Sequence, residues 1–409
     1  MIAAAPEAGD GFAPDDPAFV ADPYPVYAEL RRDRPVCYDE ATDHWLITRH
    51  ADVNALLRDR RFGRTYLHVA SHEAMGRPAP PAWHEPFWRL INAGILDMEA
   101  TDHTRVRRLV SKAFTPAYVE ALRPRVQAIV DGLLSQIDDT GVVDLLPTVA
   151  EPLPVTVIAE MLGVPPDERH LLRPWSADIC RMYELHPSVE SQRAAVSAST
   201  EFSGYLRALA RERARRPGED LISELAAVVD DGERLTEDEL VGTVVLLLNA
   251  GHEATVNATL LGWWTLFRDP EQLERLRADH AMVPTAIEEL LRFDTPLQLF
   301  ERWVLEDVEV DGVPIPRGAE LGLVFGSANR DPAVFAQPDA LDLAREPNPH
   351  LTFGAGIHFC LGAPLGRLEL QTSFRSLLER FPKIELAEAP RWKPNYIIRG
   401  LEGLRVRLR

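Results

Sequence analysis

One cysteine near the C-terminal end stands in a glycine-rich segment whose residue types suit a metal site. Residues 353–362 read FGAGIHFCLG, with the cysteine at position 360. Gly354 and Gly356 allow positive φ and let a bulky group lie against the backbone. Amides that converge on the Cys360 sulfur would stabilise the thiolate, which is the form of cysteine that binds metals. Because one cysteine cannot build a cysteine-rich zinc site, a lone thiolate with a flat, apolar approach suits haem iron.

Two other interpretations of this segment are weaker. A buried structural cysteine would explain Cys360 by itself, but it leaves the other nine residues unexplained. A dinucleotide-binding loop requires a third glycine, and none follows Gly354 and Gly356 at the required spacing. The ten residues together closely resemble the cysteine loop of the cytochrome P-450 family.

The resemblance implies a haem b cofactor with Cys360 as the axial ligand of its iron. Thiolate-ligated haem is the hallmark of that family, so this step rests on the family and not on the spacing. The other loop positions that the resemblance assigns to cofactor binding are Phe353, His358 and Gly362.

A long helix is expected to position the opposite side of such a site. Thr236 and Glu239 form a capping box that begins the helix, and Pro270 stops it. About 32 residues at 1.5 Å each give roughly 48 Å, enough to cross a domain. Gly251 thins the middle of this helix and makes room for a ligand. Glu253 follows closely, and a buried carboxylate there needs a partner or a task.

In the P-450 family this stretch flanks the oxygen-binding side of the haem, and a threonine hydroxyl helps to deliver protons. Ala254 occupies that threonine position here, and Thr255 lies about 100° further round the helix. Ordered waters and a substrate hydroxyl could complete the relay with Glu253, or the reaction could need less proton delivery. Ala254 could also be a neutral packing choice. The predicted catalytic set is Gly251, Glu253, Ala254 and Thr255.

Further motifs resemble the family in the same chain order. His103 and Arg107 are four residues apart on a helix predicted over 101–114, so they point the same way. The resemblance implies that this pair holds the haem propionates, for which the arginine fork is well suited. It assigns the same task to Arg302, His350 and His358.

A second pair is expected to be structural. Glu289 and Arg292 have the i,i+3 spacing of an ion pair and resemble the Glu-x-x-Arg signature of the family, with Arg345 as the third partner. Substrate contacts are predicted at Leu297, Leu299 and Ile397, which could equally be core residues. The proline-rich segment 76–86 is expected to be a loop, which in the family covers the substrate.

The elements around these motifs predict a mostly α protein with a minor β part. The haem would lie between the long helix and the cysteine loop, in one domain over residues 1–409 with a flexible lead over 1–21. Helical periodicity dominates from 51 to about 268. The first helix is predicted over 24–32. The predicted β segments are 36–38, 45–48, 304–323 and 392–408.

Composition excludes several classes of function. The 44 basic and 63 acidic residues give 44 − 63 = −19, which disfavours nucleic acid and anionic membranes as partners. No apolar run approaches the length of a membrane span. The N-terminus lacks a signal-like pattern, and three scattered cysteines favour a reducing cytoplasm.

The resemblance implies a monooxygenase that inserts one oxygen atom from O2 into an apolar, natural-product-like small molecule by hydroxylation or epoxidation. Because the chain has no flavin or iron–sulfur motif, electrons are expected from an external ferredoxin and ferredoxin reductase. The basic residues Arg105, Arg108 and Lys112 could attract an acidic ferredoxin. Two alternatives remain open, namely oxidative coupling of carbons or aromatic rings by the same haem, and a haem-binding sensor without catalysis.

Overall fold

Helices form most of the computed structural model, which describes residue 7 and residues 11–137 and 141–408. The α-helices are α1 (Pro17–Ala21), α2 (Tyr24–Asp33), α3 (His50–Leu56), α4 (Glu85–Asn92), α5 (Ala100–Ala113), α6 (Pro116–Ala121), α7 (Arg123–Ser135), α8 (Pro152–Met161), α9 (Leu172–Cys180), α10 (Val189–Arg215), α11 (Leu221–Ala227), α12 (Glu237–Arg268), α13 (Pro270–Ala278), α14 (Val283–Phe293), α15 (Phe325–Ala328) and α16 (Ala363–Arg380). This confirms the predicted mostly α fold.

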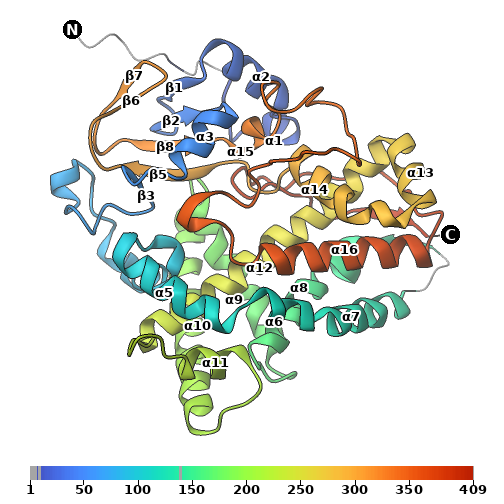
Figure 1. Cartoon of the computed structure of the whole chain (residues 1–409), viewed down its shortest axis with the longest axis horizontal. Helices are drawn as coiled ribbons and strands as arrows, with labels where there is room; N and C mark the ends of the chain where they lie inside the picture. Colours follow the sequence, from blue (N-terminus) through green and yellow to red (C-terminus); the bar gives the residue numbers. More distant parts are fainter. Residues whose placement is uncertain (1–6, 8–10, 138–140, 409) are drawn as a thin grey trace.

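The strands form small sheets, and the largest has the order β1-β2-β8-β5-β3. Its strands β2 and β8 are parallel, whereas the other neighbours are antiparallel. The strands are β1 (Val36–Asp39), β2 (His44–Ile47), β3 (Phe62–Gly63), β4 (Val142–Asp144), β5 (Phe300–Val304), β6 (Val308–Val310), β7 (Val313–Ile315), β8 (Glu320–Leu323), β9 (Glu385–Leu386) and β10 (Arg405–Arg407). In Figure 1 this sheet lies above the helical part of the molecule.

The long helix α12 begins where the sequence predicts, with the reciprocal capping box of Thr236 and Glu239. It contacts α8, α9, α10, α14 and α16, so it runs through the helical core (Figure 1). Trp263 of α12 is fully buried and stacks on Phe374 of α16, with ring centroids 4.9 Å apart. Since α16 begins directly after the cysteine loop, this packing sets the loop's position relative to α12.

The predicted ion pair between Glu289 and Arg292 is present at the end of α14. Both side chains are fully buried, and Arg292 donates from Nε and Nη2 to the two carboxylate oxygens at 2.7 Å. Arg345 adds a third bond from Nε to Glu289 Oε2 at 3.0 Å. Arg292 also donates to the backbone oxygens of Asn329 and Pro338, so the triad ties α14 to the segment before the cysteine loop.

The predicted flexible lead is too long. Residues 17–21 form α1, whose Phe19 and Val20 are buried against Tyr27 and Tyr396 in a cluster of apolar side chains. Burial of these side chains gives the segment a fixed place in the fold. Residues 1–6 and 8–10 lie outside the described residues. Among the helices described, none has both the length and the apolar character that a membrane crossing requires.

Candidate active site

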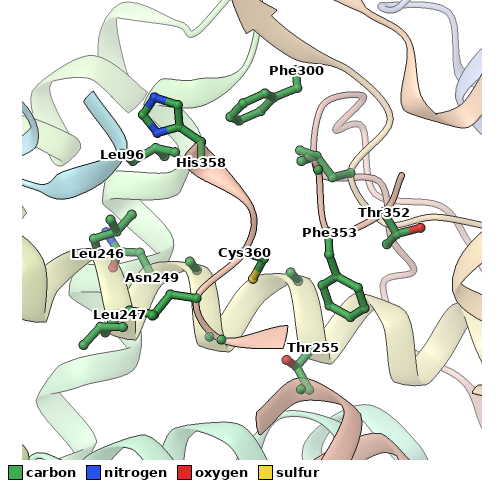
Figure 2. A pocket seen from close by; sticks show the side chains of 18 of the residues that line it. Leu96, Leu246, Leu247, Asn249, Thr255, Phe300, Thr352, Phe353, His358 and Cys360 are labelled. Carbon is green, nitrogen blue, oxygen red and sulfur yellow. The ribbon is translucent and has the colours of Figure 1, made fainter. Parts of the chain in front are cut away.

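A cavity of about 330 Å³ lies between α12 and the loop that carries Cys360. Figure 2 shows Phe353, His358 and Cys360 around the same space as Leu246 and Asn249 of α12. Strand β5 and the segment before it add a third wall. The cavity therefore has the position that the sequence predicts for haem and substrate.

The local fold of the cysteine loop depends on two glycines. Gly354 and Gly356 have φ values of +67° and +71°, which side chains other than glycine rarely adopt. A Cβ on Gly356 would lie 2.3 Å from the backbone oxygen of Leu57. The amide of Cys360 donates to the backbone oxygen of Phe353 at 2.9 Å, which closes the loop and brings the sulfur to the cavity wall.

Burial and the neighbouring donors act in opposite directions on the pKa of the Cys360 thiol. Burial raises the pKa of the thiol, whereas the amide of Gly362, the guanidinium of Arg107 and the amide of Ala363 act to lower it. Hydrogen-bond donors of this kind stabilise a thiolate that is bound to a metal. The donor set therefore fits a sulfur ligand to iron.

Three basic side chains at the edge of the cavity each have one buried nitrogen without a hydrogen-bond partner. These atoms are His103 Nε2, Arg302 Nη2 and His358 Nε2, and no described residue accepts a hydrogen bond from them, although Glu99 Oε1 lies 3.8 Å from His358 Nε2. Burial lowers the pKa of His103 to about 4 and that of Arg302 to about 9. An unsatisfied buried donor costs about 1–3 kcal/mol, so these groups fit the carboxylates of a bound haem.

The remaining predicted cofactor residues are placed differently. Arg107 lines the cavity and donates from Nη2 to the backbone oxygen of Phe359 at 2.8 Å. His350 does not line it, because its Nε2 lies 3.0 Å from an Oε of Glu288, and its assignment to the propionates is corrected. The sequence reasoning missed Arg64, which lines the cavity with Nε unpartnered. Arg64 directly follows the two-residue strand β3, and the sequence around it carries no motif that could have revealed it.

Comparison with known proteins decides the family. The sequence pattern of the family described as Cytochrome P450 matches residues 189–395. The chain is 43% identical over 390 residues to nocardicin C N-oxygenase of Nocardia uniformis subsp. tsuyamanensis, covering 93% of this chain and 94% of that protein. The chain belongs to the cytochrome P450 family. This confirms the resemblance that the cysteine loop carries.

Two further P450 proteins are similar to this P450 over most of its length. It is 40% identical to the cytochrome P450 monooxygenase PikC of Streptomyces venezuelae, over 96% of this chain and 92% of that protein. The crystal structure of P450BioI in complex with an acyl carrier protein that carries hexadec-9Z-enoic acid superposes with a TM-score of 0.89 at 35% identity, covering 96% of this chain and 99% of that one. The P450 is therefore an oxygenase enzyme with a haem cofactor, and the alternative of a non-catalytic sensor is not supported.

Three of the four predicted catalytic residues of the P450 line the cavity, namely Gly251, Ala254 and Thr255. Glu253 is not among the lining residues. Its two oxygens lie 3.8 Å from Lys393 Nζ and 3.8 Å from His252 Nδ1. The side chain thus has the partner that a buried mid-helix carboxylate requires.

The sequence reasoning missed a second carboxylate of the P450. Glu369 of α16 lines the cavity, as Thr255 does, and is 2% exposed. Burial raises its pKa to about 8, so it holds its proton at neutral pH. The sequence did contain a signal for Glu369, because this acidic residue lies between Leu368 and Leu370 in a helix that follows the cysteine loop.

Many of the side chains that line the cavity are apolar. Leu297, Leu299 and Ile397 line it, as the sequence predicts. Thr243 and Asn249 of α12 also line it, and their side-chain polar atoms are buried with no hydrogen-bond partner among the described residues. Because an unpaired buried amide is costly, Asn249 is suited to bind a polar group of a ligand.

The predicted basic patch is neutralised within the chain. Arg105 pairs with Glu239, and Asp230 pairs with both Arg108 and Lys112. These cations therefore present less positive charge to a partner than the sequence alone indicates.

Proposed function

We propose that this P450 inserts one oxygen atom from O2 into an apolar, natural-product-like small molecule by hydroxylation or epoxidation. The observation that carries this proposal is the mostly apolar cavity wall, in which Thr243 and Asn249 of α12 present polar atoms that have no hydrogen-bond partner among the described residues. Such a wall favours a substrate that is mostly hydrocarbon with at least one polar substituent. The names of the relatives, a nocardicin N-oxygenase and PikC, support a natural product.

The chain's own residues supply the binding and orientation of the cofactor. Cys360 would hold the iron, and His103, Arg302 and His358 would bind the propionates. Haem supplies oxygen activation when it receives electrons from outside the chain. The three cysteines at 37, 180 and 360 are too far apart to form a Cys-x-x-Cys-His attachment motif, so a haem held without covalent attachment, haem b, is favoured.

Proton delivery is proposed to depend on the substrate. Ala254 offers no hydroxyl, and Thr255 and Glu369 are the lining residues nearby that carry exchangeable protons. Glu253 would act through water, since its carboxylate lies outside the lining. A hydroxyl of the substrate would then complete the chain of hydrogen bonds.

The electron donor is proposed to be a ferredoxin with its reductase. The absence of flavin and iron–sulfur motifs from the sequence supports an external donor. A cytoplasmic location stays a prediction, supported by three free cysteines.

A second candidate is oxidative coupling, in which two C–H or O–H hydrogens are removed and a bond forms between the two positions. With two electrons from the external donor, both atoms of O2 would then leave as water. The observation that favours it is Ala254, because a reaction that does not retain oxygen in the product places different demands on proton delivery.

The test begins with a titration of purified holoenzyme against hydroxylated macrolactones and aromatic cyclic peptides, following the Soret band. Turnover of each ligand that shifts the band, with a surrogate ferredoxin, its reductase and isotopically heavy O2, then separates the two reactions by mass spectrometry. A product with one heavy oxygen atom supports the proposal. A product that has lost two hydrogens and gained no oxygen supports coupling, and no shift with any macrolactone would count against the proposed substrate class.

A further inference from the structure

Three ionisable side chains meet on one face of the largest sheet, and one of them, Glu301, also lines the cavity. His44 comes from β2, Glu301 from β5 and Glu320 from β8, and these strands are neighbours in the order β2-β8-β5. His44 Nε2 lies 3.7 Å from Glu301 Oε1 and 3.9 Å from Glu320 Oε2. One ligand atom from each residue falls within 4.8 Å of the other two.

The orientation of the His44 ring is fixed by its other nitrogen. Nδ1 lies 2.6 Å from the backbone oxygen of Thr42, so Nδ1 carries the proton that this bond requires. Nε2 then faces the two carboxylates. The ring is 8% exposed, and Nε2 has no hydrogen-bond partner in the described chain. Once Nε2 has lost its proton, a backbone carbonyl behind Nδ1 and carboxylates in front of Nε2 give the usual surroundings of a metal-bound histidine.

The distances do not match a simple hydrogen-bonded pair. A charge-assisted N–H···O bond is about 2.7–2.9 Å long, whereas Nε2 stands nearly equidistant from two oxygens at 3.7 and 3.9 Å. Two ligands of a tetrahedral zinc ion with bonds of 2.0–2.1 Å lie roughly 3.3 Å apart. Small changes in the two flexible glutamate side chains would therefore bring all three atoms to one ion.

The arginines near the two glutamates also pair with other carboxylates, so they do not fully neutralise the glutamates. Arg64 lies 3.6 Å from Glu301 Oε2 but also pairs with Asp97, and Arg77 pairs with Asp43. The side chains of Glu301 and Glu320 are 30% and 18% exposed, so an ion and a water ligand can reach them.

We propose that His44, Glu301 and Glu320 bind a divalent transition-metal ion, with Zn²⁺ as the preferred occupant. Imidazole nitrogen and carboxylate oxygen are both zinc ligands, and three protein ligands leave one position for water. The site cross-links three strands. Glu301 precedes Arg302 on β5, so a bound ion would also restrain the strand that presents Arg302 to the haem cavity.

A proton is the competing occupant of Nε2. Burial works to lower the pKa of His44, but Glu301 and Glu320 outweigh it and raise the pKa to about 9. A metal must displace that proton, and for this reason binding is best measured at mildly alkaline pH.

The experiment is a calorimetric titration of chelator-treated holoenzyme with ZnCl2, in which haem already occupies Cys360. We expect one Zn²⁺ per chain, and at least a tenfold weaker affinity in both His44→Gln and Glu320→Gln. The matched control is His280→Gln, because His280 lies 3.7 Å from a single carboxylate, Glu379. This control should bind zinc as the wild type does.

The haem spectrum of each variant reports whether it has folded, and the wild-type stoichiometry stands even if one variant fails to fold. Zinc binding below one ion per chain at micromolar concentration would overturn the proposal. Unchanged affinity in Glu320→Gln, or an equal loss in His280→Gln, would also overturn it, because the ion would then sit elsewhere.

Discussion

At the scale of single residues, Ala254 removes a hydroxyl from the cavity wall at the position where the family carries a threonine. Thr255 lines the cavity, but its neighbour Gly366 places it on the α16 side. A shift of one residue along a helix turns a side chain by about 100°, so Thr255 cannot reproduce the missing hydroxyl.

The variant Ala254→Thr should retain haem but change the fraction of reductant that appears in product. The new threonine hydroxyl in the cavity wall would compete with the substrate hydroxyl for a place in the hydrogen-bond chain that delivers protons. The measurement is product formed per reductant consumed, with the carbon monoxide difference spectrum as the check on haem. Unchanged coupling and regiochemistry would contradict substrate-dependent proton delivery.

Asn249→Leu should weaken binding of any macrolactone that shifts the Soret band by about 5- to 30-fold. A lost hydrogen bond to a buried amide corresponds to about 1–2 kcal/mol. Leu247→Met, which alters an apolar lining residue, serves as the control and should change affinity less. Equal dissociation constants for wild type and Asn249→Leu would show that the amide does not contact the ligand.

Glu369 should make stability depend on pH in an identifiable direction. Its pKa is raised to about 8 in the folded state by burial, so between pH 4.5 and 8 the unfolded chain releases a proton that the folded chain keeps. Its contribution to the free energy of unfolding therefore falls as pH rises, by at most about 1.4 kcal/mol per pH unit. Glu369→Gln should remove this dependence in urea titrations of the holoenzyme from pH 5 to 8. Parallel pH profiles for the two proteins would contradict the buried, protonated state.

At the scale of elements, the buried triad of Glu289, Arg292 and Arg345 joins α14 to the segment before the cysteine loop. Removing one member of a buried pair leaves the other charge uncompensated. The triad acts on the cofactor only through the position of that segment.

Glu289→Gln should lower the free energy of unfolding by about 3–5 kcal/mol. The matched control is Glu120→Gln, which breaks an i,i+3 pair with Arg123 on the surface and should cost less than about 1 kcal/mol. Urea denaturation of both variants measures the difference. Similar losses in the two variants would mean that the triad contributes no more than a surface pair.

At the scale of the whole molecule, a charge of −19 works against association with an acidic electron donor. The local cations of α5 are the exception, but Asp230 neutralises Arg108 and Lys112. Docking of an acidic donor on α5 would therefore require Arg108 and Lys112 to interact with the donor in place of Asp230.

Asp230→Asn should speed reduction of the haem by a ferredoxin at low ionic strength, because it frees both cations to face the donor. The gain should shrink as salt is raised, since exposed charges are screened. Asp311→Asn, which removes the partner of Arg49, is the control. Stopped-flow reduction rates that are unaltered by Asp230→Asn would indicate another docking surface.

The sequence by itself determined the family, the cysteine loop and the long helix. Cys360, the two glycines before it and the capping box of α12 are local patterns, and local backbone rules are sufficient to interpret them. The i,i+3 pair of Glu289 and Arg292 is local in the same sense.

Only the tertiary structure decided which distant side chains share a space. His350 carries the residue type of a propionate ligand, yet Glu288 holds it outside the cavity. Arg64, Asn249 and Glu369 line the cavity without a sequence motif, and His44 meets Glu301 through strand order. Such encounters depend on how the sheet and the helices pack, and spacing along the chain carries no information about that packing.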